Sequence, residues 1–382
     1  MAEDALDHWY FRDSLQLDRV QFVGGIFIGL GANGRLATSV DGRTWVLRNT
    51  GTTARLSGVA YGTVLAGPGS PGNLFIAVGS DATILSSPDG TNWTKVVTTN
   101  TCSLNDVAWN GTRFVAAATR CNTSQPNALW SYDGVNWQPT TFPGGTSSYD
   151  CYAASRIVAV GTAFIVATGP CCAYDIWRIS ASFTSWTKVG FSEQVVAGLV
   201  NSGDRLLLVG WGGWPMSSTN LGTSWFAVGD TNVCSPSPGQ FCMAGGDVAY
   251  GNATFVIARS WIRDGLLTTT DCSTWKMRPA LKGFSVNSVA FGNGTFVAVG
   301  EEGIFQSEAV AAPILSASRV AESNALQLVI SGEVGRSYRL QTSALSTAWS
   351  DRWVYTNNSG SVVFIDPITP EASRLFYRVV SP

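Results

Sequence analysis

VAFGNGTFVAVGEEGIFQS, residues 289–307, contains a unit that recurs along the first three hundred residues of the chain. Two alternating apolar runs, 289–291 and 296–299, flank Gly-Asn-Gly, a pattern typical of an antiparallel hairpin with a tight turn. A second turn at Glu302-Gly303 leads to a third apolar run. Repetition of such a unit at a fixed period predicts a propeller or a solenoid.

Aligned with itself, the unit occurs seven times. The seven hairpins open at Val20, Val59, Val107, Ile157, Val196, Val248 and Val289. The tryptophans that close successive copies are Trp9, Trp45, Trp93, Trp137, Trp186, Trp225 and Trp275. Their mean spacing is about 44 residues, the length of one four-stranded propeller blade.

The two ends of the repeat region complement each other. The last copy stops at Ser307 without its closing strand, whereas the chain begins with a closing strand, residues 8–12, that has no hairpin of its own. If this first strand completes the last sheet, no sheet edge stays exposed. The sequence therefore predicts an all-β fold, a seven-bladed β-propeller over residues 5–308 that is closed by its N-terminal strand.

A short acidic motif precedes most of the closing tryptophans. Asp41, Asp89, Asp133 and Asp271 stand four residues before a Trp, and Asn220 takes this place in a longer copy. An Asp side chain accepts N–H bonds across its own turn, a following Gly adopts positive φ, and a Trp packs between blades. We interpret these acids as structural and not catalytic.

This motif resembles the Asp-box, or BNR, repeat of sialidase-like propellers, a group that includes photosystem assembly factors and xyloglucan hydrolases. The resemblance extends over roughly residues 5–308. It implies the propeller fold but little about function, because in that family the box lies away from the site.

The last part of the chain differs from the repeats. Residues 309–318 are small and uncharged, which predicts a linker, and residues 319–382 contain alternating runs at 326–330, 338–341, 362–365 and 375–380 that predict a small β-sandwich. The segments 364–367 and 376–379 resemble the C-terminal module of many large secreted bacterial proteins. That resemblance implies export or surface display.

Composition excludes several partners. The net charge is −2, charged residues make up 13% of the chain, and no Lys/Arg cluster occurs, so a nucleic-acid partner is not expected. No run of about 18 apolar residues predicts a membrane span. The single histidine, His8, and the lack of a metal-binding spacing predict no metal and no cofactor.

The eight cysteines predict disulfides. Hairpin register places Cys102 opposite Cys121 and Cys151 opposite Cys172, although a slip of one residue would substitute Cys171. Cys234 and Cys242 bracket a short loop, and Cys272 stays unassigned, as does Cys171. Disulfides indicate an oxidising compartment, so we expect a secreted or cell-surface protein whose signal peptide is not part of this sequence.

Blade geometry sends the inter-blade connections and the loops between second and third strands to one side, here called the loop-rich face. Flat aromatic rings among hydrogen-bonding side chains suit a carbohydrate, although the same rings could merely pack the loops. The predicted ligand-binding residues are Trp211, Trp214, Trp261, Tyr149, Tyr152, Tyr174, Arg120, Arg259 and Arg263.

Three functions are compatible with the sequence. The first is carbohydrate binding on the loop-rich face, without catalysis. The second is a glycoside hydrolase or polysaccharide lyase, which needs two carboxylates about 5 to 10 Å apart. Its candidate acids are Asp150, Asp175, Glu193 and Glu301. The third is a protein-binding assembly scaffold. Oligomeric state and ligand identity are not determined by the sequence.

Overall fold

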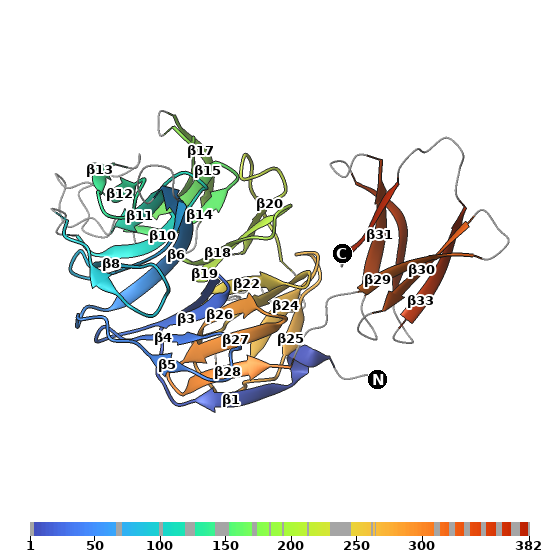
Figure 1. Ribbon diagram of the computed structural model, residues 1–382, viewed down its shortest axis with the longest axis horizontal. Helices are drawn as coiled ribbons and strands as arrows, with labels where there is room; N and C mark the ends of the chain where they lie inside the picture. Colours follow the sequence, from blue (N-terminus) through green and yellow to red (C-terminus); the bar gives the residue numbers. More distant parts are fainter. Residues whose placement is uncertain are drawn as a thin grey trace.

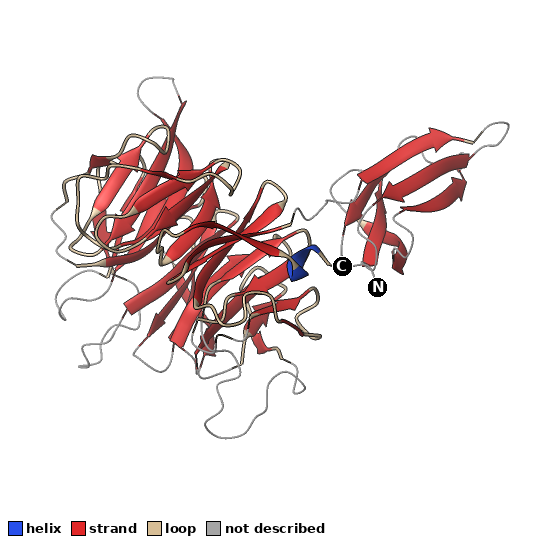
Figure 2. Ribbon diagram, turned by 90° about the horizontal axis from the view of Figure 1, so that it is seen from below, coloured by secondary structure: helices blue, strands red, loops and turns tan. Residues whose placement is uncertain are grey.

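The fold was analysed in a computed structural model of the chain. The structure describes residues 4–65, 71–98, 102–118, 127–141, 153–169, 174–182, 185–192, 195–211, 214–229, 246–260, 263, 265–308, 314–320, 325–331, 337–344, 349–356, 361–367 and 375–380. Strands make up nearly all of the regular structure in these ranges, and a short 3-10 helix, η1 (Ala5–Asp7), lies near the N-terminus (Figure 2). Within them, no helix has the length and apolar character needed to cross a bilayer.

The described residues form seven four-stranded antiparallel sheets and two three-stranded ones. The first sheet contains β2 (Arg19–Val23), β3 (Ile26–Leu30), β4 (Leu36–Ser39) and β5 (Val46–Leu47), and the second contains β6 (Leu56–Leu65), β7 (Pro71–Gly79), β8 (Ile84–Ser87) and β9 (Thr94–Lys95). The third contains β10 (Leu104–Trp109), β11 (Phe114–Ala118), β12 (Ala128–Ser131) and β13 (Gln138–Thr140), and the fourth contains β14 (Ala153–Val160), β15 (Ala163–Gly169), β16 (Tyr174–Ile179) and β17 (Trp186–Ser192). The fifth to seventh are β18 (Val195–Asn201), β19 (Leu206–Trp211), β20 (Met216–Ser218), β21 (Phe226–Ala227); β22 (Val248–Gly251), β23 (Thr254–Ile257), β24 (Leu266–Thr269), β25 (Lys276–Arg278); and β26 (Val286–Gly292), β27 (Thr295–Gly300), β28 (Gly303–Ser307) with β1 (Trp9–Asp13).

The hairpin that defines the repeat has the predicted turn. In the seventh sheet Gly292 pairs with Thr295, and the two residues between them, Asn293 and Gly294, have φ of 48° and 75°. Two positive φ angles in a two-residue loop make a type I′ turn, whose twist matches that of the flanking strands. The Asn-Gly pair therefore sets the register of β26 against β27.

The middle strands are buried on both faces. Every residue of β11 and β27 is buried, whereas β5, β9 and β21 at the outer ends are two residues long and exposed. Both faces of a strand are shielded from solvent only when its sheet lies between two others. The consecutive alanines of β11 suit this position because they let neighbouring sheets approach closely.

Seven apolar clusters in the described residues join these sheets in sequence. Each cluster takes its side chains from two consecutive sheets. One of them joins the last sheet to the first, with Phe27 and Trp45 on one side and Val297 and Ile304 on the other. Each of the seven sheets therefore has an apolar neighbour on both faces.

The N-terminal strand completes the seventh sheet. β1 pairs antiparallel with β28, with Trp9 opposite Ser307 and Phe11 opposite Phe305, as expected for residues 8–12 (Figure 1). The segment before β1 continues onto the sixth sheet. There Leu6 is fully buried in the cluster between the sixth and seventh sheets. The buried guanidinium of Arg278 donates to Asp7 Oδ1 at 2.9 Å and to Asp4 Oδ2 at 2.6 Å.

The acidic turns are hydrogen-bonded as expected. Asp41 Oδ1 accepts the N–H groups of Arg43 at 2.8 Å and Thr44 at 3.0 Å, and Trp45 Nε1 donates to Gly42 O at 3.1 Å. The carboxylates of Asp89, Asp133 and Asp271 accept the equivalent pair of backbone bonds. These acids therefore hold their own turns.

The C-terminal part forms two three-stranded sheets around one core. One contains β29 (Ile314–Arg319), β30 (Ala325–Ser331) and β33 (Ser361–Pro367), and the other β32 (Ser350–Thr356), β31 (Ser337–Ser343) and β34 (Phe376–Val380). Leu328, Ile330 and Leu340 are fully buried between them. The expected linker over residues 309–318 is wrong in its second half, because residues 314–318 belong to β29 and pair with β30. Alternating small residues conceal this strand in the sequence.

A buried carboxylate links the two C-terminal sheets. Asp366 of β33 is 1% exposed and accepts hydrogen bonds from Arg352 Nη2 of β32 at 2.8 Å and from the Tyr377 hydroxyl of β34 at 2.9 Å. Burial, together with the bond to Asp366, raises the pKa of Tyr377 to about 12. The hydroxyl therefore remains a donor to Asp366 throughout the physiological pH range.

We predict that Leu6→Ala lowers the free energy of unfolding by about 2 to 5 kcal/mol, because it leaves a cavity where the N-terminal segment meets the sixth and seventh sheets. Urea unfolding followed by tryptophan fluorescence measures this loss. Val97→Ala is the control, since Val97 is 91% exposed and its truncation should change stability by less than about 0.5 kcal/mol. Equal effects of the two changes would contradict the docking of Leu6.

A second prediction concerns pH. Burial acts to raise the pKa of Asp133, but hydrogen bonds, chiefly from Asn136 and Val135, outweigh it and lower the pKa from 3.8 to about 2. A carboxyl group with a lowered pKa in the folded state stabilises the fold above its unfolded pKa and loses this contribution as the pH falls toward 2. Asp133→Asn should therefore be less stable than wild type at pH 7, and the difference should shrink between pH 4 and 2. Urea midpoints at pH 7, 4 and 2 measure it, and a difference independent of pH would refute the assignment.

Candidate functional site

One position of the repeat brings side chains of several sheets together, and the place where they meet is here called the axis. It is the residue immediately before the alternating run of each innermost strand, and it occupies the same register in every sheet. Its seven occupants are Arg19, Gly58, Asp106, Arg156, Gly198, Asp247 and Ser288. In the fifth sheet the register begins the run at Leu199 and not at Val196, because Val196 stands before the bulge residue Ala197, as Leu104 stands before Asn105 in the third sheet.

Backbone bulges turn this position inward. The innermost strands of five sheets shift register by one residue directly before it, for example between Leu104 and Asp106 and between Val286 and Ser288. A bulge bends its strand and redirects the next side chain. Side chains from sheets that are not sequence neighbours therefore meet at the axis.

The guanidinium of Arg19 is the centre of this axial cluster. Its Nη1 lies 2.8 Å from Asp106 Oδ1 and its Nη2 3.3 Å from Asp106 Oδ2, a two-pronged contact. Nη1 also donates to Ser57 O at 3.0 Å, and Nε lies 3.5 Å from Asp247 Oδ2. One side chain of the first sheet thus contacts the second, third and sixth sheets.

The axial charges strongly influence one another. Burial acts to lower the pKa of Arg19, but the charges of Asp106 and Asp247 outweigh it and raise the pKa above its ordinary value. The pKa of Arg156 is lowered, first by burial and then by the positive charge of Arg19. The two arginines and two aspartates together carry no net formal charge.

Two glycines of the same register leave room for the carboxylates. A Cβ on Gly58 would stand 2.8 Å from Asp106 Oδ1, and one on Gly198 would stand 3.0 Å from Asp247 Oδ1. Both distances are shorter than ordinary carbon–oxygen contacts. Any larger residue at either position would push the carboxylates away from Arg19.

The axial cluster forms the floor of a pocket of about 340 Å³ that opens where the innermost strands begin, on the loop-rich face. The ion pair of Arg55 with Asp18, 3.1 Å apart, lies on its rim. The other lining residues are Arg19, Leu56, Ser57, Ser80, Ser103, Leu104, Asn105, Arg156, Asp247, Asn287 and Ser288.

This geometry is suited to binding a polar group. Both carboxylates already accept hydrogen bonds: Asp106 from Arg19 and the backbone of Val107, and Asp247 from Val248 N and Ser288 Oγ. Both carboxylates are therefore held in fixed positions. The described residues contain no group of His, Cys, Asp and Glu side chains that could hold a metal ion.

The predicted carbohydrate residues are placed differently. Tyr174 is 4% exposed in the apolar cluster between the fourth and fifth sheets, and Arg259 is 4% exposed with its Nη1 3.1 Å from Met277 Sδ. Neither side chain is exposed, and a role of either in ligand binding stays a prediction. Successive side chains of β16 point to opposite faces of the sheet, and that of Tyr174 points into this cluster. The half-buried ring of Trp214 packs against the core and lies against Gly229. Arg263 is exposed and pairs with Glu301 and Glu302.

The predicted acids are not brought together among the described residues. Asp175 of the fourth sheet pairs with Lys188 at 2.6 Å, and Glu301 of the seventh sheet pairs with Arg263 at 2.9 Å. Trp211 belongs to β19, but its side chain lies outside the described part. Asp150, Glu193, Tyr149, Tyr152, Trp261 and Arg120 lie outside the described residues altogether. A catalytic pair among these acids stays a prediction.

The cysteines are partly described. Cys102 is disulfide-bonded, and Cys272 is buried and free. Burial raises the pKa of Cys272 to about 11, so it is an unreactive thiol. Cys121, Cys151, Cys171, Cys172, Cys234 and Cys242 lie outside the described residues, so their pairing stays a prediction.

Sequence reasoning missed the axial cluster, although a signal for it was present. The seven copies align at the first residue of the alternating run, and one residue earlier stand two Arg and two Asp in a chain that has only 13% charged residues. Reading down that column of the repeat would have identified them.

We predict that Arg19→Met lowers the free energy of unfolding by about 3 to 5 kcal/mol, because Asp106 and Asp247 would then be buried without their cation. Arg55→Met is the matched control. Its ion pair with Asp18 has side chains 64% and 33% exposed, so its loss should cost less than about 1 kcal/mol. Chemical denaturation of both variants measures the difference, and similar losses would show that the axial cluster does not hold the sheets together.

No protein-family model matches the chain, and no curated protein sequence does. Solved structures do match. YCF48 bound to a D1 peptide is 16% identical, with a TM-score of 0.55 over 80% of this chain and 97% of that one. The β-propeller domain of Cps50 (Swd1) from Myceliophteria thermophila is 13% identical, with a TM-score of 0.55 over 79% and 99%. The extracellular domain of a putative hybrid two-component system, BT3049, from B. thetaiotaomicron is 8% identical, with a TM-score of 0.54 over 98% of this chain and 55% of that one. At these identities the likeness shows the fold alone, which is that of a β-propeller.

Proposed function

We propose that this protein is a non-catalytic binding scaffold that holds a polypeptide segment over the axial pocket of its loop-rich face. The observation that carries the proposal is the axial pocket itself. Its lining includes the side chains of Arg19, Arg156 and Asp247, Arg19 is paired with Asp106 and Asp247, and Ser and Asn residues complete the wall. Donors and acceptors alternate around one small opening, as in sites that fix the orientation of a polar ligand.

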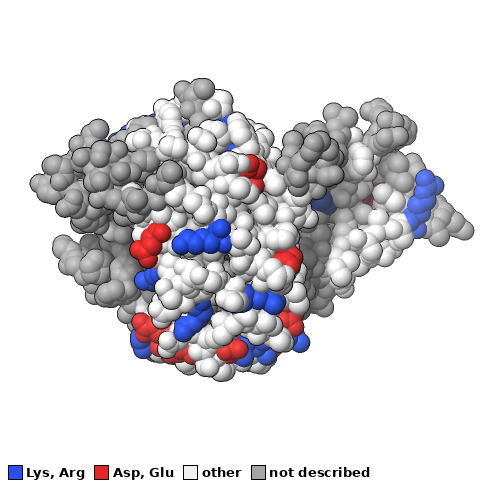
Figure 3. All heavy atoms as spheres, turned by 60° about the vertical axis from the view of Figure 1, so that its left-hand side comes forward, with Lys and Arg blue, Asp and Glu red and all other residues white. Residues whose placement is uncertain are grey.

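A polypeptide fits this chemistry better than a polyanion does. Amide groups are both donors and acceptors, and the axial cluster offers both with no net formal charge. On the face in Figure 3, Lys and Arg residues lie interspersed with Asp and Glu among uncharged residues, without a large patch of one sign. The YCF48 structure of the same fold was solved with a D1 peptide, which supports peptide binding as a use of such a propeller.

The wider architecture of the proposal is a closed seven-bladed propeller over residues 5–308 that carries a β-sandwich module over residues 319–382. The seven shared apolar clusters and the pairing of β1 with β28 support it. We also propose that the protein works outside the cytoplasm. The disulfide at Cys102 supports an oxidising compartment.

Carbohydrate binding on the loop-rich face is the weaker candidate there. Of its predicted residues, Tyr174 and Arg259 are buried and Arg263 is ion-paired. A glycoside hydrolase or lyase is weaker still, because the axial acids already accept hydrogen bonds and Asp175 and Glu301 lie on different sheets with basic partners. An assay for reducing-end release would test this alternative directly.

Selection from a random dodecapeptide phage library tests the peptide proposal. Peptides enriched on the wild-type protein are labelled and titrated by fluorescence anisotropy against Asn287→Trp, which fills the pocket, and against Lys95→Trp, which places the same ring on the exposed strand β9. We expect Asn287→Trp to weaken binding at least tenfold, a loss of about 1.4 kcal/mol, and Lys95→Trp to leave it unchanged.

Two results would overturn this proposal. One is that no peptide is enriched above a surface without protein. The other is that the enriched peptides bind Asn287→Trp as tightly as wild type while its unfolding midpoint is normal. Either result would mean that the axial pocket is a structural cavity.

A further inference from the structure

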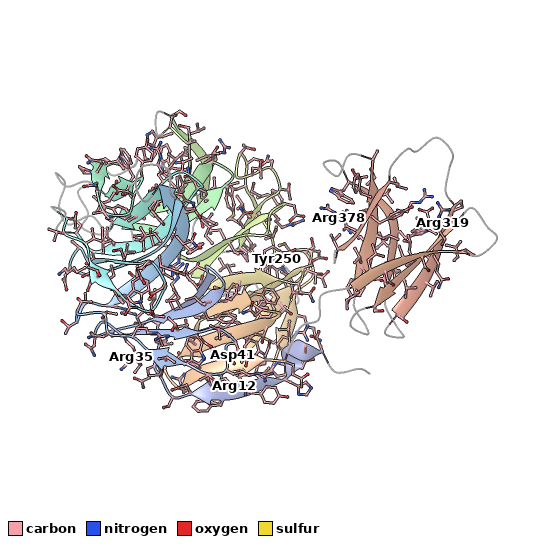
Figure 4. All side chains as sticks on the ribbon, in the orientation of Figure 1. Arg12, Arg35, Asp41, Tyr250, Arg319 and Arg378 are labelled. Atoms are coloured by element: carbon pink, nitrogen blue, oxygen red, sulfur yellow. The ribbon has the colours of Figure 1, made fainter. Side chains whose placement is uncertain are left out.

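A second hollow, here called the seam groove, lies where the last sheet meets the first. It has a volume of about 820 Å³ and shares no residue with the axial pocket. Figure 4 labels Arg12 and Asp41, which contribute to it from β1 and from the acidic turn after β4. The complete lining is Tyr10, Arg12, Val40, Asp41, Arg43, Asn293, Thr295, Gln306, Ser307 and Glu308.

The floor of the seam groove is rigid. Gln306 is 3% exposed, and its amide is bonded at both ends: Nε2 donates to Asp41 O at 2.8 Å, and Oε1 accepts from Arg12 Nε at 2.9 Å. Asn293 Nδ2 donates to Val40 O at 2.6 Å. These bonds cross the seam, so the groups from β1, β28 and the first sheet keep fixed positions relative to one another.

The walls of the groove carry two arginine side chains with unused donors. Arg12 donates to Gln306 through its Nε alone, and within the described residues its Nη groups have no hydrogen-bond or carboxylate partner. The exposed Arg43 side chain likewise makes no hydrogen bond or ion pair in the described part of the chain. This differs from Arg19, whose Nη1 and Nη2 both donate to Asp106 inside the protein. Unused guanidinium forks are suited to a carboxylate from outside.

The groove also presents an aromatic ring and two acceptors. Tyr10 is 44% exposed, with Arg12 Cζ 5.1 Å from its ring centroid and its hydroxyl donating to Glu308 Oε1 at 2.7 Å. The Oδ2 atom of Asp41 and the Oε2 atom of Glu308 make no hydrogen bond within the described residues. Exposed carboxylate oxygens accept hydroxyl groups, and a ring face covers the C–H face of a sugar.

We propose that the seam groove binds an acidic saccharide, a sugar unit that carries one carboxylate. The arginine forks take the carboxylate, the Tyr10 ring covers the sugar, and Asp41 and Glu308 accept hydroxyl groups. The four ionisable side chains Arg12, Arg43, Asp41 and Glu308 have no net charge. A phosphodiester chain would place several anions beside the two carboxylates, which disfavours nucleic acid and phosphate-rich ligands.

The seam site is independent of the proposed peptide site and lies on the side of the turns, not on the loop-rich face. Binding is measured by isothermal titration with trimers of galactose, glucose and mannose in which one unit is the corresponding uronate, and with the fully neutral trimers in the same linkages. We expect at least one uronate to bind and its neutral counterpart to bind at least tenfold more weakly.

Variants then locate the binding. Arg43→Gln and Tyr10→Ala should each weaken uronate binding about tenfold, since each removes a major contact, whereas Tyr10→Phe keeps the ring and should retain most of the affinity. Arg55→Gln, an exposed arginine on the axial rim, is the matched control and should bind normally. Asn287→Trp should also bind uronate normally, which separates this site from the peptide site.

Any of four outcomes would overturn the proposal. They are no binding by any uronate, equal binding of the neutral trimers, full affinity in Arg43→Gln and Tyr10→Ala, and loss of binding in Arg55→Gln. The last would move the saccharide to the axial mouth. Thermal unfolding of each variant tests whether the fold is intact, and Arg43→Gln should keep it because the Arg43 side chain makes no hydrogen bond or ion pair with any described residue.

Discussion

The antiparallel pairing of β1 with β28 is the contact on which the rest of the structure depends. Without β1, the seventh sheet would expose the edge of β28, and the N-terminal segment would not reach Arg278 on the sixth sheet. The first and last sheets would still have apolar faces to cover, since Phe27 and Val297 share one cluster. Each middle strand is apolar on both faces, so an open row of sheets would leave two such faces in water.

The packing of the sheets against one another creates two kinds of polar site. At the axis, side chains from several sheets converge, and glycines at two of the seven positions make room for buried ion pairs centred on Arg19. These charges satisfy one another. At the seam, strands from opposite ends of the chain meet, and the guanidinium groups of Arg12 and Arg43 have donors left over. The axis therefore forms a fixed pocket with no net formal charge, and the seam presents guanidinium donors that have no partner among the described residues.

Local features of the fold could be predicted from the sequence because they depend on neighbouring residues. The Asn293-Gly294 turn, the bonds of Asp41 to its own turn and the unpaired first strand follow from short-range stereochemistry and from counting copies. Site residues were harder. Tyr174 and Arg259 are among the ligand-binding residues that the sequence predicts on the loop-rich face, but both side chains are 4% exposed. A single side chain's exposure depends on the neighbouring sheet, which periodicity within one strand does not report.

The sequence by itself determined the sheet unit, the number of its copies and the presence of a first strand to complete the last of them, because hairpins and turns are encoded within a few residues. Only the tertiary structure decided which side chains share a site. Arg19 meets Asp106 and Asp247, which are 87 and 228 residues away, and Arg12 meets Gln306, which is 294 residues away. The physical reason is tertiary packing: the pairing of β1 with β28 and the contact of the last sheet with the first set these distances, and no local pattern carries that information.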